Sequence, residues 1–89
     1  MMDPGTIVLS TAGRDSGRLF AVVGTPEEGF RWIADGRLRG LDRPKKKKLR
    51  HLKELGYSPR LKDLTVSEGL TNSLLRKELA LFEESQRKL

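Results

Sequence analysis

The chain has 89 residues, of which 36% are hydrophobic, and a formal net charge of +6; a chain this short forms one small domain with little room for a deep catalytic cleft. It contains no cysteine, which excludes disulfides and thiolate metal sites, and its longest apolar run, "LFAVV", is far too short for an export signal or a membrane span. We therefore expect a soluble cytoplasmic protein with no cofactor, and the positive charge favours a polyanionic partner such as nucleic acid over a membrane surface.

The first third of the chain has the composition of β-strands. The runs "TIVLS" (6–10) and "RLFAVVGT" (18–25) are rich in Val, Ile, Leu and Phe, and the second run is apolar on both faces. A strand that is apolar on both faces is typical of a tightly curled sheet that is covered on each side. "TPEEG" (25–29) is predicted to be a turn and "FRWIA" (30–34) a third strand.

The loop between the first two strands, "AGRDSGR" (12–18), carries more charge than a turn requires. Gly13 and Gly17 permit positive φ or a close approach of the backbone. We expect Arg14 and Arg18 to contact RNA, since a guanidinium binds phosphate as a fork and stacks on bases. Asp15 would repel phosphate, so we expect an internal brace that bonds loop amides or orients an arginine. The alternative is a polar hairpin loop whose arginines are only solvated.

The third strand and the segment after it hold further candidates. Trp32 shares one strand face with Phe30, and the pair either stacks on unpaired bases or, as we favour, belongs to the core. "DG" (35–36) signals a hairpin, and "RLRGLDR" (37–43) is predicted to be a short fourth strand. On that strand Arg37 and Arg39 would face the same way and extend a basic surface.

Positive charge is concentrated between residues 37 and 62, which hold eleven of the eighteen Lys and Arg residues and only two acids. A run of lysines suits phosphate contacts, which set affinity without reading sequence. The alternatives are a solvated basic loop and, less favoured, a membrane-surface segment. The spacing of the leucines does not decide whether residues 48–55 form a strand or a short helix. The RNA contacts expected from "PKKKKLRHL" (44–52) are Lys45, Lys46, Lys47, Lys48, Arg50 and His51.

The remaining aromatic and titratable candidates are few. Tyr57 is expected in a loop, where it is a weaker candidate for stacking on a base. His51 is the single histidine and has no cysteine or second histidine beside it, so no metal site is expected. The sequence has no phosphate-binding Gly-Lys-Ser motif and no recognisable catalytic pair of carboxylates, so we expect no enzyme.

The clearest helix in the sequence runs from about residue 72 to residue 86. Leu75, Leu79 and Phe82 form an i, i+4, i+7 apolar stripe. Thr71 or Asn72 can cap the start of the helix. The elements together predict a mainly β fold with a C-terminal helix, built from four or five strands curled into a small barrel. We place the barrel in residues 1–62 and a helical extension, packed on the barrel or used for docking, in residues 63–89.

Three segments, in this order, resemble a known family. "GTIVLSTAGRDSGRLFAVVG" (5–24) resembles a KOW motif, a β-loop-β unit with glycine before the first strand and at both ends of its loop. With "IADGRLR" (33–39) and "PKKKKLRHL" (44–52), the chain is similar to KOW-type large-subunit ribosomal proteins of archaea and eukaryotes and to short bacterial KOW-domain RNA-binding proteins. The resemblance covers residues 5–55 and leaves the tail from 63 to 89 outside it.

The resemblance implies an SH3-like barrel that binds RNA and has no enzyme activity. Ribosomal RNA is the favoured partner, ribosomal proteins or polymerase are further ones, and association with the ribosome is expected. The sequence leaves the oligomeric state open, with a monomer favoured. The alternative function is a protein-interaction adaptor of the translation or transcription machinery, which would use the barrel and the leucine-rich helix.

Overall fold

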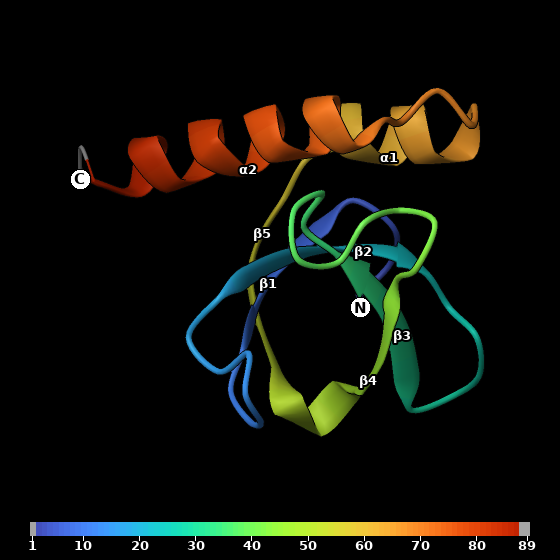
Figure 1. The fold of residues 1–89 in the computed structure, drawn as a ribbon, viewed down its shortest axis with the longest axis vertical. Coiled ribbons are helices and arrows are strands. Elements are labelled where there is room, and N and C mark those ends of the chain that lie inside the picture. The colour runs from blue at the N-terminus through green and yellow to red at the C-terminus, as the bar shows by residue number, and fades with distance from the viewer. Residues whose placement is uncertain (1, 88–89) are drawn as a thin grey trace.

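In the computed structural model, which describes residues 2–87, a strongly curved sheet lies beneath two helices (Figure 1). The strands follow the order β4-β3-β2-β1-β5, and every neighbouring pair is antiparallel. A short 3₁₀ turn, η1 (Leu49–His51), connects the two edge strands, so the sheet curls into a small barrel-like ring. The elements are β1 (Thr6–Ser10), β2 (Leu19–Gly24), β3 (Phe30–Ala34), β4 (Lys45–Lys48), β5 (Leu52–Tyr57), α1 (Pro59–Val66) and α2 (Asn72–Arg87). The predicted mainly β fold with a C-terminal helix is confirmed.

The sheet has an apolar core on each of its faces. The core inside the barrel consists of Val8, Phe20, Val22, Ile33 and Leu52. The core between the sheet and the helices consists of Ile7, Ala21, Ala34, Leu61, Leu75 and Leu79. The strand β2 supplies residues to both cores, which explains why its sequence has no polar face.

Helix α2 is fixed to the sheet along its predicted stripe. The backbone N–H of Leu74 donates to Thr71 Oγ1 at 3.1 Å, so Thr71 caps the helix. Leu75 and Leu79 are buried against the sheet and Phe82 is half-buried. The helix therefore packs on the barrel along this stripe, and the predicted boundary after residue 62 falls inside α1. Within residues 2–87, no helix combines the length and the apolarity needed to cross a membrane.

The fourth strand is displaced from its predicted position. Residues 37–43 form bends and turns rather than a strand, because Asp35 Oδ1 accepts the backbone N–H groups of Arg37 and Arg39, each at 2.9 Å, and so closes a tight turn. The fourth strand is instead the lysine run, β4, which pairs with β3. Residues 48–55, which the sequence left open, divide among the end of β4, the turn η1 and the start of β5.

Candidate nucleic-acid interface

The loop between β1 and β2 is a closed, compact structure. The backbone N–H of Gly17 donates to the carbonyl of Ser10 at 2.8 Å, and the N–H of Ser10 donates to the carbonyl of Arg18 at 3.0 Å. Gly13 and Gly17 adopt φ values of +85° and +86°, which confirms the prediction that this loop needs residues without a Cβ atom. The loop therefore holds its own backbone in place at the point where the first two strands end.

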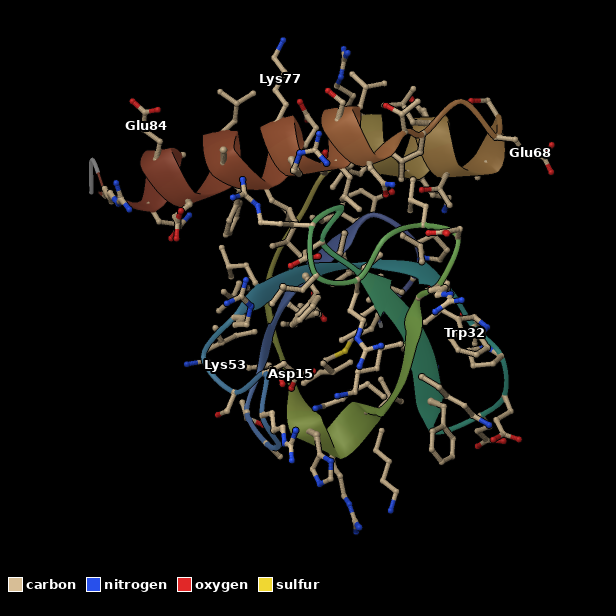
Figure 2. The ribbon with its side chains drawn as sticks, in the orientation of Figure 1. Asp15, Trp32, Lys53, Glu68, Lys77 and Glu84 are labelled. Atoms are coloured by element: carbon tan, nitrogen blue, oxygen red, sulfur yellow. The ribbon has the colours of Figure 1, made fainter. Side chains whose placement is uncertain are left out.

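Asp15 connects this loop to the lysine strand. Its carboxylate accepts hydrogen bonds from Lys47 Nζ at 2.7 Å, Lys45 Nζ at 2.9 Å and Ser10 Oγ at 2.7 Å. Lys47 Nζ also donates to the carbonyl of Ala12 at 2.7 Å. Figure 2 shows Asp15 directed from the loop toward the barrel. We call Ser10, Asp15, Lys45 and Lys47 the Asp15 clasp.

The clasp sets the charge state of its carboxylate. Burial of Asp15, whose side chain is 12% exposed, by itself raises the pKa. The hydrogen bonds from Lys47, Ser10 and Lys45 outweigh this effect and hold the pKa of Asp15 well below its usual range. The residue is thus the internal brace that the sequence predicts. Its partners differ from the expected loop amides and arginines, because they are Ser10 and two lysines about thirty positions away.

The four lysines of β4 have two different environments. Successive side chains of a strand point to opposite sides, so Lys45 and Lys47 belong to the clasp, and Lys47 is only 7% exposed. Lys46 is exposed, forms an ion pair with Glu27 at 2.6 Å and lies 4.7 Å from the ring centroid of Phe30. Within residues 2–87, Lys48 alone of the four has a side chain with no ion pair or hydrogen bond. The run therefore differs from the uniform cationic segment that its sequence suggests.

The exposed cations around the loop define what we call the basic surface. The backbone N–H of Thr11 donates to the carbonyl of His51 at 2.9 Å, which brings η1 against the start of the loop. A hollow of about 280 Å³ between loop and strand is lined by Ala12, Gly13, Phe30, Lys46, Lys47, Lys48 and His51. Four of the exposed cations next to the β1–β2 loop and η1 have side chains that form no ion pair or hydrogen bond in the part of the chain that the structure describes. The basic surface consists of these four, Arg14, Lys48, Arg50 and Lys53, together with the half-buried His51.

Lys53 is a member of this surface that sequence reasoning missed. It lies on β5 opposite Leu9 of β1, near the start of the β1–β2 loop. Figure 2 shows its side chain pointing outward on the same side as Asp15. In the sequence, the apolar Leu52 followed by the charged Lys53 could have indicated that Lys53 points outward. That inference requires knowing that this segment is a strand, in which successive side chains point to opposite sides.

The remaining predicted arginines lie beside a second hollow. Arg18 Nη2 is 3.9 Å from Asp35 Oδ2, and Arg18 and Arg37 line a hollow of about 360 Å³ next to α2. Arg39 is exposed in the turn that Asp35 closes. The β1–β2 loop touches both hollows, because Gly13 lines the first and Gly17 the second.

Of the aromatic candidates, Trp32 and Tyr57 lie away from the hollow beside the lysine strand, and Phe30 lines it. The favoured core assignment of Trp32 and Phe30 is wrong, because both are half-buried and neither belongs to an apolar core. Trp32 lies on the opposite side from Lys53 (Figure 2), in a hollow of about 250 Å³ with Val23, Leu41, Pro44, Thr65, Glu68 and Leu70. Tyr57 is exposed at the end of β5 rather than in a loop. Phe30 and His51 are the aromatic rings that line the basic hollow.

Residues 2–87 contain no group of three or more side chains suited to holding a metal ion. No protein-family model matches this chain, and no curated protein matches it either. The resemblance to KOW proteins therefore remains a prediction from the three sequence segments quoted above.

Proposed function

We propose that this protein is a non-catalytic RNA-binding protein that contacts the backbone of structured RNA, with ribosomal RNA as the favoured target. The observation that supports it most is the basic surface, on which Arg14, Lys48, Arg50 and Lys53 have no internal partner within residues 2–87. Unpaired, exposed cations release counterions from phosphates when they bind, which supplies sequence-independent affinity. The resemblance to KOW proteins supports the same function.

The Asp15 clasp removes an objection to this proposal. A carboxylate in a phosphate-binding loop would normally weaken binding, but Asp15 bonds two ammonium groups. The three charged groups together carry a net charge of +1, so the field near the loop stays positive. The clasp also orders the loop before RNA arrives, which lowers the entropic cost of binding.

The proposal is tested by fluorescence anisotropy of a labelled, structured ribosomal RNA fragment titrated with the full chain. Arg14→Ala and Lys48→Ala are each expected to weaken binding at low salt without changing the unfolding midpoint. Lys77→Ala is the matched control, because its side chain points away from the barrel on the outer face of α2 (Figure 2). Equal affinity of all four proteins, or no binding by the wild type at low salt, contradicts the proposal.

A second candidate function is docking of another protein. The leucine stripe of α2 does not support it, since Leu75 and Leu79 are buried in the helix–sheet core. The hollow around Trp32 does support it, because it is largely apolar and lies away from the basic surface. Ribosome co-sedimentation distinguishes the two functions: attachment through this hollow persists at high salt and is lost in Trp32→Ala, whereas attachment through phosphates is lost at high salt.

A further inference from the structure

Three arginines from separate parts of the chain meet between the barrel and α2. Arg18 comes from the β1–β2 loop, Arg37 from the turn after β3 and Arg76 from α2. They line the hollow of about 360 Å³ described above, together with Gly17, Leu19, Asp35, Leu79, Ala80 and Glu83. We call this hollow the arginine notch.

Of the two carboxylates of the notch, Asp35 is paired with a notch arginine and Glu83 with an arginine outside the notch. Asp35 is 9% exposed, its Oδ1 accepts two backbone N–H groups at 2.9 Å, and its Oδ2 lies 3.9 Å from Arg18. Glu83 Oε1 lies 3.9 Å from Arg87 Nη2, one helical turn further along α2. Arg37 and Arg76 therefore have no carboxylate partner within residues 2–87, Arg18 is paired with Asp35, and the lining keeps a net charge of +1.

The notch is also partly ordered before any ligand binds. Arg76 Nη1 donates to the carbonyl of Gly36 at 2.5 Å, which ties α2 to the turn that carries Arg37. A guanidinium has five N–H donors, so Arg76 keeps most of them for a ligand. Arg37 has no side-chain ion pair or hydrogen bond in the described range 2–87. Planar guanidinium forks of this kind match the geometry of phosphate oxygens.

We propose that the arginine notch binds a backbone phosphate of the RNA, so that the RNA interface continues from the β1–β2 loop onto α2. This inference rests on the proposed function and extends it to the C-terminal helix, which lies outside the KOW resemblance. The loop borders both hollows, through Gly13 on one side and Gly17 on the other. An RNA strand that crosses the loop would therefore reach the basic surface and the notch together.

The test compares Arg37→Ala and Arg76→Ala with Lys77→Ala, the neighbour of Arg76 whose side chain points away from the barrel (Figure 2). Affinity for the structured ribosomal RNA fragment is measured by anisotropy over a salt series. Each notch variant is expected to bind about tenfold more weakly at low salt, as the loss of one charge-assisted contact implies. On duplex RNA its slope of log K against log salt is expected to be shallower by about 0.9. Lys77→Ala is expected to match the wild type.

The outcomes separate this inference from the proposed function. If Arg14→Ala weakens binding while both notch variants bind like the wild type, phosphate binding by the arginine notch is ruled out and the proposed RNA-binding function is retained. If the wild type does not bind RNA, the proposed function fails and the notch fails with it. Arg76 also donates a hydrogen bond to the carbonyl of Gly36, so Arg76→Ala could unfold the protein. In that case the affinity of Arg37→Ala alone tests the arginine notch.

Discussion

Replacing Asp15 with asparagine removes the negative charge of the clasp while keeping the size of the side chain. The native carboxylate accepts hydrogen bonds from two lysines and a serine. An amide has no charge, and its NH2 group would face one of the two ammonium groups, since Lys45 and Lys47 bond different oxygens of the carboxylate. The Lys47 side chain, which is 7% exposed, is then left as a buried cation without a counter-charge.

The expected cost follows from the burial of the three charged groups. Removing one partner of a buried ion pair costs about 3–5 kcal/mol. Lys45 is 29% exposed and can turn to water, and Lys47 keeps its bond to the Ala12 carbonyl, so we expect the lower end, about 3 kcal/mol. In a domain of this size that loss lowers Tm by about 12–24 °C.

The assay is urea unfolding of Asp15→Asn at pH 7, followed by circular dichroism and by the fluorescence of Trp32. Asp63→Asn is the matched control, because Asp63 is exposed on α1 and its side chain forms no ion pair or hydrogen bond within residues 2–87. A loss below about 1 kcal/mol in Asp15→Asn, well under the 3–5 kcal/mol of a broken buried pair, or a loss equal to that of the control, would mean that the Asp15 clasp does not stabilise the fold as a buried ion pair.

The same substitution has a pH signature. The folded-state pKa of Asp15 lies below the unfolded value of about 3.9. Its contribution to stability is therefore fully present above that value and is lost as the pH falls toward the lowered pKa. The stability difference between the wild type and Asp15→Asn should be constant from about pH 5 to 8 and should shrink below about pH 4. A difference that does not change down to about pH 2 contradicts this account.

Further predictions concern the clasp and the turns beside it. Lys47→Met is expected to destabilise less than Asp15→Asn in the same unfolding assay, because Asp15 keeps Lys45 and Ser10 as partners; the reverse order would contradict the role of Lys47 as the buried charge. Gly17→Ala is expected to cost about 1–2 kcal/mol from backbone strain alone, since its φ is +86° and no atom lies near an added Cβ. Gly36→Ala should cost more, because its added Cβ would lie 2.5 Å from the Asn72 carbonyl oxygen. Equal unfolding midpoints for the two glycine variants would contradict this prediction and show that the backbone moves to relieve the close contact.

The sequence predicted those elements whose signals are local. The apolar run of β2 and the glycines of the loop each identify their structure from neighbouring residues alone. The lysine strand β4 could not be predicted this way, because lysine is depleted in strands and these residues become a strand by pairing with β3. The inward direction of Lys47 likewise depends on Asp15, which is distant in sequence.

The candidate site was predicted less completely than the fold, because it depends on contacts between residues that are distant in the sequence. The basic segment and the loop arginines are visible in the sequence, but which cations remain free depends on tertiary partners. Arg76 joins the notch only because α2 packs across β2. Trp32 alternates with Ile33 of the barrel interior and so lies on the other face of β3, where its neighbours in the hollow include Leu41 and Leu70 from distant parts of the chain.

We propose that exposed cations around the β1–β2 loop bind RNA phosphates. The decisive measurement is the salt dependence of RNA affinity for the wild type and for a variant with Arg14, Lys48 and Arg50 changed to alanine. On duplex RNA the loss of these three cations is expected to make the slope of log K against log salt shallower than the wild-type slope by about 2.7. A variant that keeps the wild-type slope would contradict the proposal.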